Sequence, residues 1–237
     1  AVEPEIQYLA DYLNACGARI EGAGTNHIRI VGGELLHSQD KPYITPPDRI
    51  ETGSFAMLAA LVGSDVVITN CKPKWLTVPL ELMRQAGVPL EISNDSIRIN
   101  TAGVSQSYKL FSVRTHEYPG FATDLQAPAA AFLSQCSGEG SILETIFDGR
   151  FRYVDDLVRM GADITVMNPH RILIRGPKKL TSKKLESPDL RGGLAYIIAA
   201  AVAEGTSTID NAYLIDRGYE RIEERLQPLG LNITRQQ

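Results

Sequence analysis

The sequence lacks an apolar run that could cross a membrane, and it lacks an excess of positive charge. Its longest apolar stretch, residues 194–203, falls well short of the roughly 20 residues that a membrane-spanning helix needs. Lysine and arginine total 24 against 28 aspartate and glutamate residues, so the net charge is −4. Such a chain has no general basic surface for nucleic acid or an anionic membrane. We therefore expect neither nucleic acid nor a membrane as its partner.

Residues that commonly hold metals and cofactors are also few. The three cysteines have no Cys-x-x-Cys spacing and match no histidine pattern, so we interpret them as reduced, structural thiols of a cytoplasmic protein. The four histidines show no metal-ligand spacing. Gly22 and Gly24 lack the third glycine of a dinucleotide-binding motif. The sequence therefore predicts neither a metal site nor a dinucleotide site.

One pattern is present three times: a turn containing proline and aspartate leads into a helix of small apolar residues. The aspartates are Asp48, Asp124 and Asp189, and the chain is organised around the central occurrence, residues 119–127. An aspartate or threonine at a helix start can accept hydrogen bonds from free N–H groups. Each aspartate, or Thr123 in the central case, is therefore a candidate N-cap.

Each repeat continues in the same order after this helix. A short β-branched strand follows, then a second helix that stops at a glycine suited to a C-cap, and then another strand. The predicted first strands are residues 66–69, 142–146 and 206–209, the second helices 76–86, 154–160 and 219–229, the glycines Gly87, Gly161 and Gly230, and the last strands 90–92, 163–166 and 231–234. Each unit spans about 40 residues, which indicates a repeat protein of few, large units.

The two helices of a repeat differ in kind. Residues 190–203 are apolar on nearly every side, whereas residues 219–226 carry a single apolar stripe. The first kind should therefore be central and the second peripheral. With 43% hydrophobic and 22% charged residues, the composition is that of an ordinary globular protein. We predict an α/β fold with helices at its centre.

The first 45 residues depart from the repeat. Apolar residues at helical spacing precede Gly17, and residues 19–21 and 28–30 follow as strands, which is the second half of a unit only. We therefore expect the chain to be a fragment or one subunit of a split protein. Residues 1–45 are then the remainder of a first domain whose N-terminal part is absent, and residues 46–237 a second domain of three units.

Four motifs share the pattern of a known family: Asp-Arg-Ile-Glu-Thr-Gly at 48–53, Tyr-Pro-Gly-Phe-Ala-Thr-Asp-Leu-Gln-Ala at 118–127, Asp-Leu-Arg at 189–191 and Asp-Arg-Gly-Tyr-Glu-Arg at 216–221. They resemble the C-terminal half of UDP-N-acetylglucosamine 1-carboxyvinyltransferase, the enolpyruvyltransferase of peptidoglycan synthesis. The resemblance runs in order along essentially the whole chain. It implies threefold βαβαββ-type repeats with central helices and outer sheets, an inside-out barrel, in each of two domains that close over a cleft.

The resemblance also implies a reaction. The enolpyruvyl group of phosphoenolpyruvate is transferred to the 3-hydroxyl of UDP-N-acetylglucosamine, with loss of phosphate and without an organic or metal cofactor. The implied enzyme is a cytoplasmic transferase of cell wall biogenesis, with roles in cell shape and the cell cycle. The N-terminal half carries the mobile loop with the catalytic acid, so we expect this chain to be inactive without that half as its partner.

The resemblance assigns roles to individual residues. Asp124 corresponds to the carboxylate that contacts the attacking hydroxyl, either as base or as positioning group. The residues placed at the substrates are Ile146 for the nucleotide sugar and Arg150, Arg191 and Arg217 for phosphoenolpyruvate, with Arg49 at the domain boundary. Planar guanidinium groups suit this substrate because they bind phosphate and carboxylate bidentately.

Other interpretations remain open at this point. All three aspartates could be plain helix caps. Arg191 near a helix start opposes the helix dipole unless an anion or an acid such as Asp189 compensates. The protein could also be similar to 5-enolpyruvylshikimate-3-phosphate synthase. A hypothesis of another class is a non-catalytic homologue acting as a binding or regulatory subunit, for which the Gly192 and Gly193 pair is the only sequence support.

Overall fold

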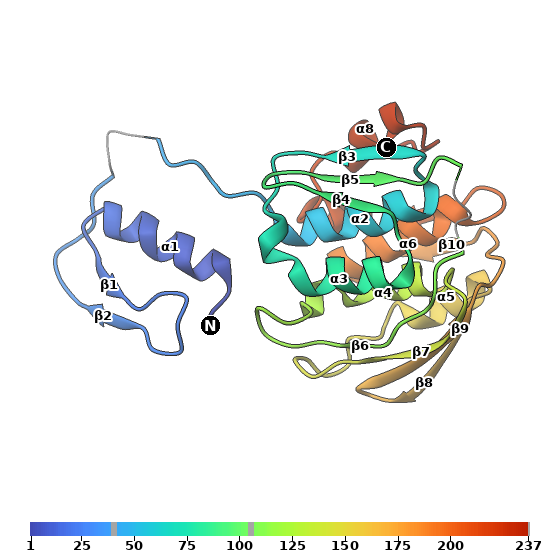
Figure 1. Ribbon diagram of the computed structural model, residues 1–237, viewed down its shortest axis with the longest axis horizontal. Helices are drawn as coiled ribbons and strands as arrows, with labels where there is room; N and C mark the ends of the chain where they lie inside the picture. The colour runs from blue at the N-terminus through green and yellow to red at the C-terminus, as the bar shows by residue number, and fades with distance from the viewer. Residues whose placement is uncertain (39–41, 104–106, 237) are drawn as a thin grey trace.

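Three helices form the centre of a mixed α/β structure (Figure 1). The computed structural model describes residues 1–38, 42–103 and 107–236. The central helices are α2 (Arg49–Val62), α4 (Gln126–Leu133) and α6 (Leu190–Val202), and they pack against one another. Every residue of α4 is buried, as are most residues of the other two. Their many alanines let the backbones approach closely, and the predicted central position of this kind of helix is confirmed.

Three sheets lie around these helices. Their strands are, in spatial order, β3 (Asp65–Ile68), β5 (Ile97–Asn100) and β4 (Leu90–Ile92) in the first; β6 (Val113–Arg114), β7 (Gly138–Leu143), β9 (Arg171–Gly176) and β8 (Asp163–Asn168) in the second; and β10 (Lys184–Glu186) with β11 (Thr208–Asp210) in the third. The first sheet is antiparallel, the third is parallel, and in the second only β6 and β7 run parallel. Figure 1 shows the first two sheets on opposite sides of the central helices.

Strand β5 shows how alternation attaches a sheet to this centre. Ile97 and Ile99 are completely buried, whereas Arg98 between them faces out and forms an ion pair with Asp65 of β3 at 2.8 Å. Successive side chains of a strand point to opposite faces, so one face joins the core and the other meets water.

The second helix of each unit is peripheral and ends at a glycine, as predicted. These helices are α3 (Thr77–Ala86), which follows η1 (Pro73–Trp75), then α5 (Val154–Met160), and α8 (Ile222–Leu226) with η3 (Gln227–Leu229). The closing glycines Gly87, Gly161 and Gly230 have φ angles of 99°, 114° and 94°. Glycine adopts this left-handed conformation without the steric cost that a Cβ atom brings.

The third unit differs from the prediction. The helix predicted over residues 219–229 is wrong in its first part. A separate short helix, α7, spans Tyr213–Asp216, and α8 begins only at Ile222, because Arg221 has a left-handed φ of 46°. The strand expected at 231–234 is absent from this described segment. Arg235 instead holds the segment down through ion pairs with Asp216 and Glu223, both at 2.6 Å.

Residues before α2 form a small separate lobe. It contains α1 (Pro4–Ala15) and the antiparallel pair β1 (Arg19–Glu21) and β2 (Arg29–Val31), and residues 42–48, which form no helix or strand, lead into α2 (Figure 1). Many of its large apolar side chains are exposed, among them Leu35 at 88% and Ile44 at 86%. The helix and strands expected in this region are present.

The glycine pair at the start of α6 has a packing role. A Cβ atom at Gly193 would overlap Ser187 and Ile215 of α7, and one at Gly192 would lie 2.7 Å from the ring of Pro188. Contacts this close are not tolerated by real side chains. Close packing therefore explains both glycines: Gly193 leaves room for Ser187 and for Ile215 of α7, and Gly192 leaves room for the ring of Pro188.

Candidate active site

Two of the three repeat aspartates cap their helices. Asp48 accepts hydrogen bonds from the backbone N–H groups of Ile50 (2.7 Å) and Glu51 (3.1 Å) at the start of α2. At the start of α6, Asp189 accepts from the N–H groups of Arg191 (2.8 Å) and of the next residue (2.9 Å). These N–H groups lack intrahelical partners, so the caps stabilise the first turns.

Asp124 does not cap a helix, and neither does Thr123. Both lie in η2 (Thr123–Leu125), the short 3-10 turn that leads into α4, and no side chain caps either element. Asp124 Oδ1 accepts a hydrogen bond from Arg150 Nη2 at 2.6 Å. Its Oδ2 accepts from Arg191 Nη2 at 3.0 Å and from Nε at 3.3 Å. The expected cap is replaced by a carboxylate held between two guanidinium groups.

The two arginines change the proton affinity of Asp124. Burial alone raises the pKa of its carboxyl, but the charge of Arg191 and the hydrogen bond and charge of Arg150 together outweigh burial. The pKa of Asp124 is therefore lower than the ordinary value for aspartate. At neutral pH the group is an ionised hydrogen-bond acceptor and a weak base.

Arg191 is fixed on a second side by Tyr219. Only 12% of its side chain is exposed. Arg191 Nη1 donates to the Tyr219 hydroxyl at 3.1 Å, its guanidinium carbon lies 5.5 Å from the centre of that ring, and the hydroxyl is also 3.1 Å from Ser54 Oγ of α2. An arginine at a helix start is unfavourable with the dipole, and here the charge of Asp124 compensates. Arg191 thus joins α4, α6 and the segment before α8.

Arg150 reaches the same carboxylate from the loop between β7 and α5. Its Nη1 donates to Thr123 Oγ1 at 2.7 Å, while its Nη2 holds Asp124. The guanidinium carbon lies 5.1 Å from the centre of the Phe147 ring, a cation–π arrangement. Arg150 is therefore oriented on three sides.

The other predicted site residues are less close to Asp124. Ile146 is half-buried near the start of the Arg150 loop. The Arg217 side chain is exposed and forms no hydrogen bond or ion pair with the residues that the structure describes. Its neighbour Gly218 packs near Arg191, because a Cβ there would lie 3.3 Å from Nη1 of that arginine. The structure thus brings Arg150 and Arg191 together at Asp124 and leaves Arg217 nearby but unengaged.

Arg49 connects the N-terminal lobe to the rest of the chain. Its side chain is 9% exposed, its Nε donates to Glu5 of α1 at 2.8 Å, and its guanidinium carbon lies 5.7 Å from the Tyr118 ring centre. The edge of the Tyr8 ring meets Trp75 with 5.3 Å between centroids. Arg49 therefore lies where the lobe touches the central helices.

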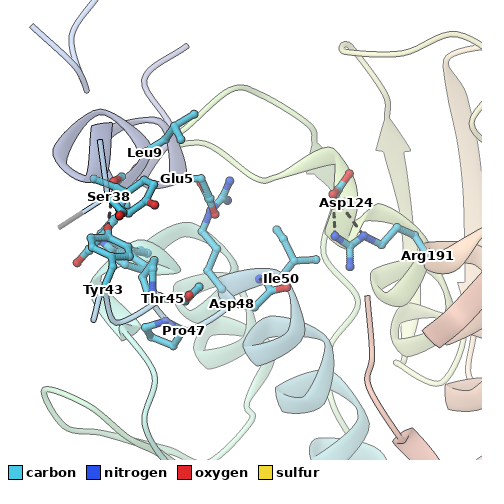
Figure 2. Close-up of a pocket in the computed structure, with 15 residues that line it drawn as sticks. Glu5, Leu9, Ser38, Tyr43, Thr45, Pro47, Asp48, Ile50, Asp124 and Arg191 are labelled. Atoms are coloured by element: carbon cyan, nitrogen blue, oxygen red, sulfur yellow. Dashed lines mark hydrogen bonds and ion pairs between the residues drawn. The ribbon is translucent and has the colours of Figure 1, made fainter. Parts of the chain in front are cut away.

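A pocket of about 930 Å³ contains three of the predicted residues. Asp124 and Arg191 lie at one end, and Arg49, which also lines the pocket, is bonded to Glu5 of α1. Figure 2 shows Glu5, Leu9 and Tyr43 at the other end. Arg150 and Arg191 carry two positive charges against the single negative charge of Asp124, so a net positive charge remains there. This charge suits an anionic ligand, and Asp124 can accept a hydrogen bond from a hydroxyl beside it.

Sequence reasoning missed one prominent residue, Glu144. It follows β7 immediately, it is 1% exposed, and its carboxylate accepts five hydrogen bonds. The available signal was a charged residue within the apolar run predicted as strand 142–146. That strand ends at Leu143, because the Glu144 side chain binds the N–H groups that would continue it.

The described residues hold no group of three or more His, Cys, Asp or Glu side chains arranged to bind a metal ion. Over the same ranges, no helix has both the length and the apolar character needed to cross a membrane.

Comparisons with known proteins cover nearly the whole chain. A family model described as EPSP synthase (3-phosphoshikimate 1-carboxyvinyltransferase) matches residues 1–226. A UDP-N-acetylglucosamine 1-carboxyvinyltransferase of Koribacter versatilis is 42% identical over 99% of this chain and 53% of that protein. One of Photorhabdus laumondii is 41% identical over 99% of this chain and 55% of that protein. The chain spans about half the length of the curated relatives it matches.

Solved structures agree on the fold. The enolpyruvyl transferase NikO from Streptomyces tendae matches with a TM-score of 0.84 at 24% identity, over 98% of this chain and 54% of that one. EPSP synthase from Acinetobacter baumannii matches with a TM-score of 0.65 at 21% identity, over 96% of this chain and 55% of that one. At these identities the likeness concerns the fold, and it agrees with the predicted fold class.

Proposed function

Because the chain belongs to the EPSP synthase family, we propose that it is the C-terminal half of a UDP-N-acetylglucosamine 1-carboxyvinyltransferase. The observation that carries this proposal is the Asp124 carboxylate held by Arg150 and Arg191 at the end of a pocket. The substrates are those in the name of the relatives that are 41–42% identical over 99% of the chain. The enzyme acts in the cytoplasm, in peptidoglycan synthesis.

The reaction joins a sugar hydroxyl to phosphoenolpyruvate. A C–O bond forms between the 3-hydroxyl oxygen and the enol carbon, the bond from that carbon to the phosphate oxygen breaks, and the hydroxyl proton is lost. Phosphoenolpyruvate carries a phosphate and a carboxylate, and both suit guanidinium donors. Arg191, Arg150 and Arg217 bind these anionic groups, Ile146 lines the nucleotide-sugar site, and Arg49 holds the boundary of the pocket.

Asp124 serves first as a positioning group and then as a proton acceptor. In the free chain both arginines hold its pKa down, so it is a weak base. An anionic substrate competes with Asp124 for the N–H groups of Arg191. When Arg191 donates to the phosphate instead, Asp124 loses part of its stabilisation by that positive charge. The pKa of Asp124 then rises, which makes it a better base when the hydroxyl is in place.

We propose that residues 1–45 belong to a first domain and residues 46–237 form the second. The exposed apolar side chains of the small lobe support this division, because large apolar surfaces are normally covered. The partner that covers them is the N-terminal half of the same enzyme. Slower hydrogen exchange in the central helices than in residues 1–45 of the isolated chain is expected. Equal exchange in both parts would count against the division.

Two other functions have weaker support. An EPSP synthase-like enzyme shares the fold, but the curated relatives of highest identity given above carry the amino-sugar name. The interpretation as a non-catalytic homologue depended on the glycine pair at 192–193, and packing of Gly192 against Pro188 and of Gly193 against α7 explains that pair.

The test is reconstitution with the N-terminal half of the Koribacter relative. We expect phosphate release that requires both halves, phosphoenolpyruvate and UDP-N-acetylglucosamine together. Release with shikimate 3-phosphate instead of the nucleotide sugar would favour the EPSP synthase reading. Release by this chain alone would contradict the requirement for a partner half.

A further inference from the structure

Glu144 is the most fully buried carboxylate beside the candidate active site. Glu144 is 1% exposed. Its carboxylate forms no hydrogen bond with Asp124 or Arg191, the two residues of this group that line the pocket. A buried carboxylate is costly unless its oxygens are satisfied. All five of its hydrogen-bond partners are donors, so both oxygens act as acceptors, as they do in an ionised carboxylate.

One oxygen of Glu144 shapes the loop that carries Ile146. Oε1 accepts from the backbone N–H groups of Ile146 (2.8 Å) and Phe147 (3.2 Å) and from Thr115 Oγ1 (2.9 Å). These bonds end β7 and turn the chain towards Arg150. Phe147, whose ring lies against the Arg150 guanidinium, is thereby fixed at its backbone.

The other oxygen sets the direction of a hydroxyl proton. Oε2 accepts from Thr123 Oγ1 at 2.7 Å and from Gln126 Nε2 at 3.2 Å. Tyr153 donates its hydroxyl to Gln126 Oε1 at 2.6 Å, so the amide nitrogen is the end of Gln126 that faces Glu144. The single Thr123 proton is therefore used on Glu144, and the Thr123 oxygen remains free to accept from Arg150 Nη1 at 2.7 Å.

We propose that Glu144 is a positioning residue that acts through Thr123 and the 146–147 backbone to hold Arg150 against Asp124. The effect on catalysis rests on the proposed function. Glu144 itself is assigned no contact with a substrate. The chain of contacts is continuous: Glu144 to Thr123, Thr123 to Arg150, and Arg150 to Asp124. An amide cannot replace this carboxylate, because its NH₂ group would face the two donors that now meet Oε2.

The variants separate positioning from ordinary structural support. Glu144→Gln removes the charge and one acceptor, and Glu139→Gln is the matched control, because Glu139 lies on the adjoining strand β7 with an exposed side chain that pairs with Arg175. Thr123→Val breaks the same contact from the other side and leaves the Oε1 bonds intact. Thr123→Ser keeps the hydroxyl and serves as its control.

The first measurement needs no enzyme activity. In the full 237-residue chain, nitrogen-15 relaxation of the Arg150 guanidinium group reports how firmly that group is held. We expect lower order in Glu144→Gln and Thr123→Val than in the parent, and unchanged order in Glu139→Gln and Thr123→Ser. If Glu144→Gln fails to fold, Thr123→Val carries this test. Unchanged Arg150 order in Thr123→Val overturns the proposal.

The second measurement is kinetic and uses the reconstituted enzyme. Loss of a hydrogen bond to a charged group predicts about a tenfold to hundredfold fall in kcat/KM for phosphoenolpyruvate in each disruptive variant. Because both variants break one chain of contacts, the double variant should be little worse than either single one. We expect the affinity for the nucleotide sugar to be unchanged. If both substrates were used equally less well, and if the double variant showed the sum of the two single effects, Glu144 would have a structural role only and the proposal would be overturned. A reconstituted parent without turnover would refute the proposed function, while the Arg150 relaxation would still decide the positioning role.

Discussion

The starts of α2 and α6 differ from the start of α4, although the same sequence pattern produces all three. At α2 and α6 the aspartate bonds to backbone N–H groups and stays with its own helix. At α4 a 3-10 turn replaces the cap, and the carboxylate of Asp124 instead binds two arginines, Arg150 of the same unit and Arg191 of the next. The same sequence pattern can therefore start all three helices while only two of the aspartates act as caps. The third carboxylate, that of Asp124, remains available to bind other side chains or a substrate.

The largest expected effect is the loss of turnover when the carboxylate of Asp124 is removed. Asp124→Asn removes the negative, proton-accepting oxygen beside the sugar hydroxyl, and loss of a general base costs about 10²–10⁴-fold in rate. Phosphate release by the reconstituted enzyme measures it. Nucleotide-sugar binding should stay near normal, and undiminished turnover would return Asp124 to a structural role.

The same variant also distinguishes a helix cap from an ion-pair partner by its effect on stability. For a simple cap, asparagine serves almost as well as aspartate, so little stability would be lost. Asp124 is instead the shared partner of two arginines, and its neutralisation leaves Arg150 and Arg191 close together without a counterion. We therefore expect Asp124→Asn to lower the free energy of unfolding by more than Asp48→Asn does. Urea unfolding of both variants measures the contrast.

The next effect compares two arginines. Arg191→Ala and Arg217→Ala should each weaken phosphoenolpyruvate use by about tenfold to a hundredfold, because charge-assisted hydrogen bonds are lost. Arg191 is also bonded to Asp124 and Tyr219, whereas Arg217 is exposed. Only Arg191→Ala should therefore lower the melting temperature. An Arg217→Ala enzyme with unchanged dependence on phosphoenolpyruvate would remove that residue from the site.

A smaller effect is expected at the capped helices. Asp48→Ala removes the acceptor of two N–H groups and should cost about 1 kcal/mol of stability, whereas Asp48→Asn should cost a few tenths. Chemical denaturation of the two variants tests the cap. Equal stability of the alanine and asparagine variants would show that this aspartate is not a cap in solution.

The smallest expected effect is a pH dependence. The pKa of Asp124 is lower in the folded chain than in the unfolded chain, so its contribution to stability is fully present above about pH 4 to 5 and is lost as pH falls through the folded value. The stability difference between the parent and Asp124→Asn should therefore shrink on acidification. A difference that grows below pH 4 would contradict the lowered pKa.

Local patterns predicted much of the fold. The all-round apolar character of residues 190–203 predicted a central helix, and Gly161 predicted a helix end, because glycine adopts the left-handed conformation readily. These signals are local in the chain. The third unit was less predictable, because Arg221 and the contacts of Arg235 interrupt a helix and a strand that propensity alone favours.

The site needed contacts that no local pattern contains. Arg191 lies 67 residues from Asp124 along the chain and Arg150 lies 26 residues away, so no local pattern identified these arginines as the partners of Asp124. Family resemblance named those residues without their geometry. Glu144 was missed because a charged residue at the end of a β-branched run looks like an exposed strand residue until its five donors are seen.

Asp124 is a carboxylate shared by two arginines and not a helix cap. A carboxyl NMR titration of Asp124 in the chain, assigned with Asp124→Asn, tests it directly. We expect a pKa below about 3.9, the ordinary value for aspartate, and a higher pKa when Arg191 is replaced by alanine. A pKa at or above the ordinary value that does not respond to Arg191→Ala would contradict it.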